Sequence, residues 1–457
     1  MLDALFRIDE RGSTVRREVL GGVTTFVTMA YIIVVNPAIL SAAGIPVGPS
    51  TVATILTAVF GSLLMGFYAN RPIAVAPYMG ENAFIAFGLV ALGATWEQRL
   101  GSVFVAGVVF LLLTVFQVRS KLANAVSPSL KYSFAAGIGL FLAYIGLYET
   151  GIVTSGAAGL PAAALLDVGQ TLLRAPAVPV KIGAFHDPRV LLAIAGFVLI
   201  VILMMRRVPG AILVGMGVTA VAGYAMGFAP APSSVMAMPF TGEYSLAPLA
   251  FHLDIAGVLK LSFLPVLLTL VLMSFLDTLG TLVGVGAAGN MLDKDGNFPQ
   301  IEQPMLVDAL SCVFASLVGT STSGAYIESA TGIREGARTG LAAIVTALLF
   351  AAALFFLPLV GPLQESRYAY GPALVAVGML MVGSMRKIEF DDLTEAVPAF
   401  ACIALMVFTY NIANGLTAGL VLYPLAKVVG GRARELNWGS VVLALLCLTY
   451  FIFGLPH

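Results

Sequence analysis

Long apolar stretches separated by short polar breaks run along almost the whole chain. The longer stretches each hold roughly 20 apolar residues, the length at which an α-helix crosses the hydrocarbon core of a bilayer. This pattern predicts an all-α polytopic membrane protein. The predicted segments lie near residues 18–42, 50–69, 72–92, 99–118, 132–150, 190–205, 210–229, 256–288, 303–319, 322–334, 339–360, 370–385, 396–412, 414–429 and 437–455.

The last quarter of the chain leaves the number of segments open between fourteen and fifteen. The segments after residue 396 are short and are separated by Asn411, Asn414 and Gly415. They form either two full spans or a hairpin of half the membrane depth. The stretch at 437–455 adds one more candidate segment at the C-terminal end.

Composition agrees with a membrane protein: 59% of the 457 residues are hydrophobic and 11% are charged. Soluble domains carry about 25% charged residues. The composition argues against a soluble enzyme, a disordered chain, a coiled coil and a nucleic-acid-binding domain. Lys and Arg total 24, as do Asp and Glu, so net charge indicates neither an acidic nor a basic partner. The expected environment is the lipid bilayer.

Basic residues in the short connections predict the orientation, because cytoplasmic loops of membrane proteins are enriched in Lys and Arg. They lie before the first segment and at every second connection after it, which places the N-terminus in the cytoplasm. We therefore predict a multi-pass protein of the cytoplasmic (inner) cell membrane. The long connections 151–189 and 230–255 then lie outside. The basic residues used are Arg7, Arg11, Arg16, Arg17, Arg71, Arg119, Lys121, Lys131, Arg206, Arg207, Lys294, Arg334, Arg338, Arg386 and Lys387.

The third and tenth segments are not regular helices. The third begins RPIAVAPYMGENAF, and Pro72 and Pro77 exclude a continuous helix through its first half. The tenth begins GTSTSGAYIESATG, which is small, polar and too short to span. Irregular backbone at membrane depth survives only where protein covers it or where it lines a cavity. Each segment is predicted to be an extended half followed by a half-helix.

The two broken segments also resemble each other. Glu81-Asn82-Ala83 aligns with Glu328-Ser329-Ala330, and each triplet follows an extended stretch that contains a tyrosine. The segments are seven apart in order, and an odd repeat length turns the second copy upside down. Paired interrupted segments in two inverted halves indicate the central site of a transporter.

Three acids lie away from the predicted helix ends: Glu81, Asp277 and Glu328. Asp277 is expected near the bilayer midplane, where an acid costs roughly 2.5–3.5 kcal/mol on insertion scales. A packing role for Asp277, bonded to Thr278 or Thr281, is the structural alternative to a functional one. Capping of the half-helices is the corresponding alternative for Glu81 and Glu328.

Together these groups fit the recognition of a flat, neutral heterocycle. A carboxylate accepts N–H groups of the ring, and the amide of Asn82 both donates and accepts hydrogen bonds. A buried carboxyl can take up a proton on one side and release it on the other. The arrangement predicts proton-coupled uptake of a neutral polar ring, and it would repel an anionic substrate. No metal or other cofactor is expected.

Several motifs in chain order resemble one family, the AzgA-like adenine/guanine/hypoxanthine permeases of the nucleobase:cation symporter-2 group. The resemblance covers nearly the whole chain. Its motifs are GGVTTFVTMAYIIVVNP at 21–37, MGENAFIAF at 79–87, DTLGTLVGV at 277–285, YIESATGIREGARTGL at 326–341 and PAFACIALMVFTYNIANG at 398–415.

The resemblance implies a fold like that of the bacterial uracil permease, with fourteen segments in two inverted sevens and short strands in segments three and ten. The repeats would be residues 1–229 and 230–457. A core domain, about 18–118 plus 256–360, would face a gate domain, about 132–229 plus 370–455. Gate-domain contacts would make a homodimer.

The resemblance also assigns site residues. Asn82, Asp277 and Glu328 would contact the purine, and the two acids would couple transport to protons. Glu81, Ser329 and Thr281 complete the predicted substrate-binding set. Glu81 departs from the family pattern, since many members have an apolar residue there.

The leading hypothesis is therefore a proton-coupled importer of adenine, guanine or hypoxanthine that works by elevator-type alternating access. One alternative is a cation-coupled transporter of another neutral heterocycle, such as xanthine or uracil, with Na⁺ open as the coupling ion. A second is an intramembrane enzyme, for which Asp391-Asp392 is an acid pair by composition but lacks its partner motif. A third is a channel or anion exchanger on the same fold.

Overall fold

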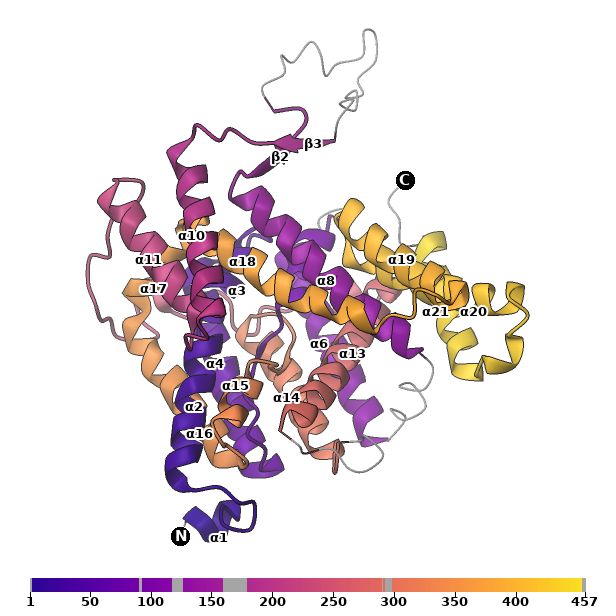
Figure 1. Ribbon diagram of the computed structural model, residues 1–457, viewed down its shortest axis with the longest axis horizontal. Helices are drawn as coiled ribbons and strands as arrows, with labels where there is room; N and C mark the ends of the chain where they lie inside the picture. Colours follow the sequence, from indigo (N-terminus) through magenta and orange to yellow (C-terminus); the bar gives the residue numbers. More distant parts are fainter. Residues whose placement is uncertain are drawn as a thin grey trace.

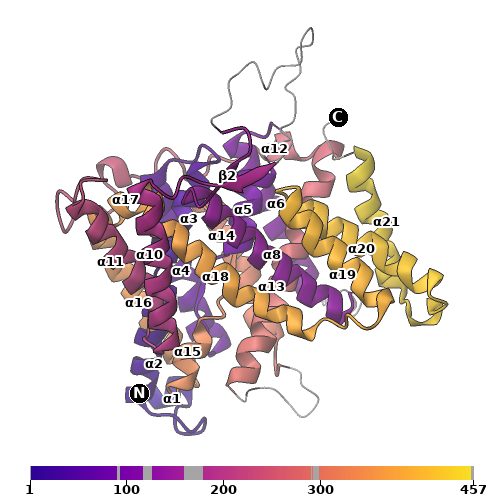
Figure 2. The ribbon, with the colours of Figure 1, turned by 45° about the horizontal axis from the view of Figure 1, so that its top comes forward.

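The computed structural model describes residues 2–89, 93–116, 126–158, 179–289, 291 and 298–453. Within these ranges the chain is a bundle of helices with four short strands (Figures 1 and 2). Among the described residues, nine helical stretches are long and apolar enough to cross a membrane: Val15–Ser41, Val47–Ala69, Trp96–Val115, Pro128–Glu149, Pro188–Met205, Leu261–Gly286, Gly340–Glu365, Arg367–Lys387 and Ile412–Val429. The predicted polytopic fold is confirmed, whereas the count of fourteen segments stays a prediction.

The first segment consists of two helices, and the second of them contains a proline. After the short α1 (Leu2–Phe6), helix α2 (Val15–Met29) is followed by α3 (Ile32–Ser41), which contains Pro37. Proline has no N–H to give to the carbonyl four residues earlier. The carbonyl of Ile33 instead accepts a hydrogen bond of 3.0 Å from the Gln364 side chain in α17 (Leu357–Glu365). The distant glutamine thus satisfies the carbonyl that Pro37 leaves free.

The third and tenth segments are broken as the sequence predicts. In the third, strand β1 (Val75–Pro77) leads into α5 (Met79–Ala83) and the π-helical turn η2 (Phe84–Gly88). In the tenth, strand β4 (Ser323–Ala325) leads into α15 (Ser329–Arg334). The two strands pair antiparallel with each other deep inside the bundle, and all six strand residues are buried. The pairing satisfies backbone groups that a membrane interior would otherwise leave unbonded.

Around the paired strands lies one set of packed helices. It comprises α4 (Val47–Leu64), α6 (Trp96–Val115), α13 (Leu264–Ala288), α14 (Glu302–Val318) and α16 (Gly340–Ala353). Helix α14 packs on α6 and α4, and α16 packs on α2 and α4. Figure 1 shows α2 and α16 side by side near the N-terminus.

A second set of helices packs mainly through α8 (Pro128–Glu149) and α18 (Arg367–Val382). Helix α18 also contacts α10 (Pro188–Met205) and α11 (Ala211–Ala225), while α8 also contacts α19 (Leu393–Phe408). These sets consist of the helices expected in the core and gate. The division into two moving domains stays a prediction.

Two glycines allow the closest contact between a half-helix and its neighbour. A Cβ atom on Gly332 of α15 would lie 2.2 Å from the backbone oxygen of Gly21 in α2. That separation is far shorter than any van der Waals contact, and backbone cannot move aside as a side chain can. Glycine is therefore required where α15 crosses α2.

The C-terminal quarter contains α19, α20 (Ile412–Val429) and α21 (Trp438–Phe453). Helix α19 lies along α20, with a break at Thr409–Asn411 (Figure 1). The 16 residues of α19 rise about 24 Å, less than the roughly 30 Å hydrocarbon core. Whether α19 and α20 cross fully or form a half-depth hairpin stays open.

The long connection 151–189 carries a hairpin of β2 (Val153–Ser155) and β3 (Val180–Ile182). Its residues 159–178 lie outside the described ranges, as do Arg119, Lys121 and Lys294. The connection 230–255 holds only a short 3-10 turn at Gly242–Tyr244, and α12 (Ile255–Val258) follows it.

Candidate functional site

The strand pair has local two-fold symmetry. Ala76 lies opposite Gly324 at the centre of the ladder. On one side the Tyr78 amide donates to the carbonyl of Thr322 at 2.9 Å, and on the other the Tyr326 amide donates to the carbonyl of Ala74 at 2.9 Å. The two tyrosines are therefore equivalent positions at the starts of the two half-helices.

This symmetry shifts the alignment of the two broken segments by one residue from the alignment predicted from the sequence. Counted from the equivalent tyrosines, Glu81 corresponds to Ser329 and not to Glu328. Their contacts agree: the Glu81 carboxylate accepts a hydrogen bond from the Thr322 hydroxyl, and the Ser329 hydroxyl accepts one of 3.0 Å from the Ala74 amide. Each side chain thus bonds to the residue four before the opposite tyrosine. The sequence alignment of Glu81 with Glu328 was wrong by one position.

Glu81 is fully buried beside α13. Its Oε2 atom accepts hydrogen bonds from Thr322 and, at 3.0 Å, from the Ser274 hydroxyl. Its Oε1 atom has no hydrogen-bond partner among the described residues. Asp277 lies three residues after Ser274 on α13, which places it one helical turn from the residue that bonds to Glu81. Two of the predicted acids are therefore neighbours, and Glu81 has one oxygen still free to bind.

Tyr78 connects these acids to a further one that the sequence interpretation missed. Its hydroxyl lies 2.8 Å from the Thr278 hydroxyl and donates to Asp308 at 3.4 Å. Asp308 is fully buried and also accepts a hydrogen bond of 2.9 Å from the Ala325 amide of β4. Its place six residues after the start of α14 could have marked it as an acid inside a span.

Glu328 lies on the other side of the strand pair. It is half-buried at the N-terminal end of α15, and its Oε1 accepts a hydrogen bond of 2.7 Å from the Tyr31 hydroxyl. Tyr326 interacts electrostatically with both Glu328 and Asp277, and its own hydroxyl donates to the carbonyl of Pro77 at 2.5 Å. The Tyr326 hydroxyl thus ties the second broken segment to the strand of the first, two residues before Glu328.

Asn82 faces a buried polar network. Its side-chain amide donates to Asn36 of α3 at 2.8 Å, and Asn36 donates in turn to Thr54 and Thr320 at 2.8 and 2.9 Å. The Asn82 Oδ1 atom has no hydrogen-bond partner within the described chain. This network joins α3, α4 and the approach to β4. The polar Asn36 directly before Pro37, within an apolar run, is the signal that could have revealed it.

The two remaining predicted residues differ in their surroundings. Ser329 is buried and bonds to the backbone beside β1, so its hydroxyl holds the two broken segments together. Thr281 lies one turn beyond Asp277 on α13 and is half-buried. It is on the same face of the helix as Asp277, because residues four apart are neighbours on a helix surface.

Each half-helix ends against an arginine. Arg99 of α6 is buried and donates to the carbonyls of Ile85 and Ala86 at 3.3 and 3.1 Å, and to that of Ala94 at 3.0 Å. Arg338 donates to the carbonyls of Ile333 and Ala337 at 2.6 and 2.7 Å. A cation at a helix C-terminus stabilises the unpaired carbonyls and the helix dipole. The two arginines therefore fix the ends of the half-helices that lie away from the acids.

Arg99→Met should lower the thermal midpoint of the purified protein by several degrees. The change leaves three carbonyls without their cationic donor, at an expected cost of about 2–3 kcal/mol. Arg99→Lys should recover part of the loss. Arg16→Met is the control, because Arg16 is exposed on α2. An unchanged midpoint in Arg99→Met would contradict this role.

The acid pair considered for an enzyme lies elsewhere. Asp392 caps α19, and its hydrogen bonds from Thr394 and its pairing with Arg432 hold the pKa of Asp392 below its ordinary value. Asp391 beside it is exposed. In the described part of the chain, no group of three or more His, Cys, Asp or Glu side chains could hold a metal ion.

A multi-pass bundle with buried carboxyl groups between two broken, paired segments is the architecture of a membrane transporter. The model of the Permease family (Xan_ur_permease) matches residues 16–417 of this chain. The chain belongs to this family, and the resemblance noted from the sequence motifs is confirmed.

Curated relatives cover almost the whole chain. The adenine permease AdeP of Escherichia coli is 38% identical over 458 residues, covering 100% of this chain and 97% of AdeP. The guanine/hypoxanthine permease PbuG of Bacillus subtilis is 38% identical over 465 residues, covering 99% of this chain and 100% of PbuG. These relatives are permeases and not enzymes.

Solved structures confirm the fold. The transmembrane domain of the cyanobacterial bicarbonate transporter BicA superimposes with a TM-score of 0.59 at 16% identity, covering 89% of this chain and 97% of that domain. The structure of SLC26A9 gives a TM-score of 0.61 at 13% identity, covering 91% of this chain and 66% of that chain. At such identities the similarity concerns the fold.

Proposed function

We propose that this protein imports purine nucleobases (adenine, guanine or hypoxanthine) across the cytoplasmic membrane together with protons. The observation that carries the proposal is the pairing of β1 with β4, beside which Glu81 bonds to Ser274, one helical turn from Asp277 on α13. A carboxyl with a free oxygen, such as Glu81 Oε1, can accept the N–H groups of a purine ring. The relatives named as adenine and guanine/hypoxanthine permeases support this substrate class.

Protons are the proposed coupling ion because carboxyl groups at this depth can cross the membrane at low cost only when neutral. Asp277 and Glu328 are the proposed carriers, and Asn82, Glu81, Ser329 and Thr281 complete the proposed substrate site. Ser329 and Asn82 would also hold the half-helices in place, because Ser329 accepts a hydrogen bond from the Ala74 amide and Asn82 donates one to Asn36.

Alternating access is proposed to be an elevator movement. The set of helices around β1 and β4 would carry the site past α8 and α18, with the N-terminus in the cytoplasm. Contacts between the gate helices of two copies would form a homodimer, as the family resemblance implies.

Cells that express the protein should accumulate at least one labelled purine base among hypoxanthine, guanine and adenine. A protonophore should abolish accumulation, whereas replacing Na⁺ with choline should leave it unchanged. Xanthine, uracil and bicarbonate complete the panel. Xanthine and uracil test other neutral rings, and bicarbonate tests the anion transported by BicA, which has a similar fold.

Uptake of bicarbonate alone would contradict the proposal. Accumulation of a purine that depends on Na⁺ and resists the protonophore would overturn proton coupling while leaving the substrate class intact. A thermal-shift measurement gives a check independent of coupling, since bound base at about 100 times its Kd stabilises the folded protein by about 2.7 kcal/mol.

A further inference from the structure

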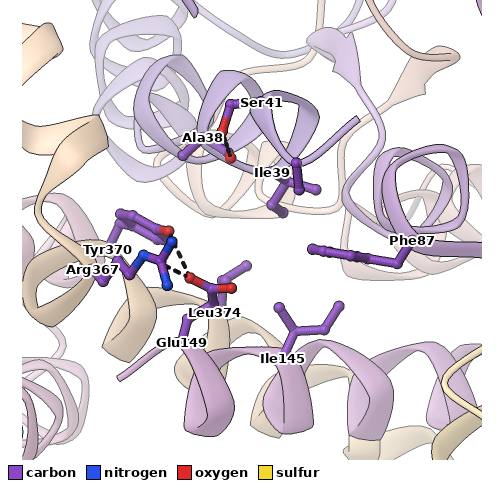
Figure 3. Close-up of a pocket in the computed structure, with 10 residues that line it drawn as sticks. Ala38, Ile39, Ser41, Phe87, Ile145, Glu149, Arg367, Tyr370 and Leu374 are labelled. Atoms are coloured by element: carbon purple, nitrogen blue, oxygen red, sulfur yellow. Dashed lines mark hydrogen bonds and ion pairs between the residues drawn. The ribbon is translucent and has the colours of Figure 1, made fainter. Parts of the chain in front are cut away.

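A cavity lies apart from the acids, at one end of the bundle. It has a volume of about 200 Å³ and is enclosed by the ends of α3, η2, α8 and α18 (Figure 3). Ser41, Glu149 and Arg367 lie at the helix ends that the distribution of basic residues places outside. The cavity therefore faces the side from which an imported substrate arrives.

One wall of this cavity is charged. Glu149 accepts a hydrogen bond of 3.2 Å from the Tyr370 hydroxyl and pairs with Arg367 at 3.2 Å, both through Oε2. No hydrogen bond within the described chain engages its other oxygen. The Glu149 side chain is 20% exposed. Tyr370 and Arg367 hold this carboxylate in place through one oxygen. The second oxygen is therefore positioned to accept a hydrogen bond from a ring N–H group.

The facing wall is flat and apolar. Phe87 of η2 enters from the side opposite Glu149, with Ile145 and Leu374 near them (Figure 3). The Phe87 ring packs edge-on against Tyr410 with centroids 5.4 Å apart, which fixes its position. An aromatic ring opposite a carboxylate and a guanidinium suits a planar, uncharged heterocycle that stacks on one face and hydrogen-bonds at its edge.

The cavity is joined to the central site by one helical element. Phe87 lies six residues after Glu81, about 9 Å further along the same broken helix. Next to Glu81 the half-helix packs closely on α8, since a Cβ atom on Gly80 would lie 2.6 Å from Cγ2 of Ile138.

We propose that this cavity is a second binding site, in which a planar nucleobase is held between Phe87 and Glu149 before it moves to the central site. The inference rests on the proposed function. Binding here places the base against the half-helix that carries Glu81 and Asn82, and Arg367 and Tyr370 keep the Glu149 carboxylate in its binding position.

The test uses a cysteine at the rim. Ser41 lines the cavity and is exposed, and the three native cysteines are buried. In Ser41→Cys, a membrane-impermeant thiol reagent added outside should modify the new thiol, and saturating hypoxanthine should slow the modification about tenfold, because only the unoccupied fraction reacts. Ser233→Cys, exposed in the connection 230–255, is the control that hypoxanthine should not protect.

Two further variants separate this site from the central one. Glu149→Gln in the Ser41→Cys background should raise the half-protecting concentration of hypoxanthine about tenfold, as expected for loss of a hydrogen bond to a charged group. Glu365→Gln, exposed nearby, should not change it. Protection should persist when Asp277→Asn disables transport.

Three results would overturn the inference. They are a Ser41→Cys thiol that outside reagent does not reach, protection that disappears with Asp277→Asn, and a half-protecting concentration that Glu149→Gln leaves unchanged. If the wild-type protein takes up no purine at all, the proposed function fails instead, and uptake measured beside the labelling distinguishes the two failures.

Discussion

Asp277→Asn should abolish accumulation of the purine base that the wild-type protein takes up fastest. Asparagine keeps the shape of the side chain but carries neither the charge nor the proton. Asp277 lies on α13 between Ser274, which bonds to Glu81, and Thr278, whose hydroxyl lies 2.8 Å from that of Tyr78. In the proposed site the base donates hydrogen bonds to the Asp277 carboxylate. Losing a hydrogen bond to a charged group costs about 1.5–3 kcal/mol, which corresponds to about a ten- to hundredfold loss of affinity for the base.

The measurement is uptake by cells with equal amounts of protein in the membrane, judged by immunoblot. Asp391→Asn is the matched control, because Asp391 is exposed in the connection before α19. Exchange of base in preloaded vesicles separates the two roles of Asp277, since exchange needs no net proton movement. Exchange without accumulation indicates proton coupling, and loss of both indicates base binding. Accumulation at the wild-type rate would remove Asp277 from the site.

Glu328→Gln should lower uptake of the base at least about tenfold, because the charge of Glu328 is lost. A variant of Tyr31, which bonds to Glu328, separates this charge from the hydrogen bond. Glutamine can still accept the hydrogen bond of 2.7 Å from the Tyr31 hydroxyl, so the start of α15 keeps its position while the charge is lost. Tyr31→Phe removes only that donor and should reduce uptake less, about two- to tenfold, because a single hydrogen bond contributes about 0.5–1.5 kcal/mol.

Glu335→Gln is the control for Glu328→Gln, because Glu335 is exposed one residue beyond the end of the same half-helix. If Glu328→Gln transports normally while Tyr31→Phe does not, the hydrogen bond positions α15 and the charge of Glu328 has no part in transport. If both are normal, Glu328 serves neither role.

Local chemistry made the broken segments predictable from the sequence. Pro72 and Pro77 exclude a helix wherever they lie, and the small polar run before Tyr326 cannot form an apolar span. The structure has β1 and β4 in these places. The acid Asp277 was likewise visible as a charge inside a long apolar run. These signals depend on neighbours along the chain and need no knowledge of the fold.

The contacts of the acids could not be predicted in the same way. Glu81 bonds to Ser274 and Thr322, which are 193 and 241 residues away in the sequence. The contacts of Asp308 with a strand amide and with Tyr78 were equally unpredictable, although its position inside a span was not. Partners at such separations are chosen by helix packing, and no local pattern encodes them.

The amino-acid sequence by itself determined that this protein spans a membrane, that two of its segments are interrupted, and that carboxyl groups lie inside its apolar runs, because hydrophobicity and the backbone limits of proline act over a few residues. Only the tertiary structure decided that β1 pairs with β4 about Ala76 and Gly324, that Glu81 corresponds to Ser329, and that Asn82 turns toward Asn36. The physical reason is that strand register and buried hydrogen bonds are set by whichever distant segment packs alongside.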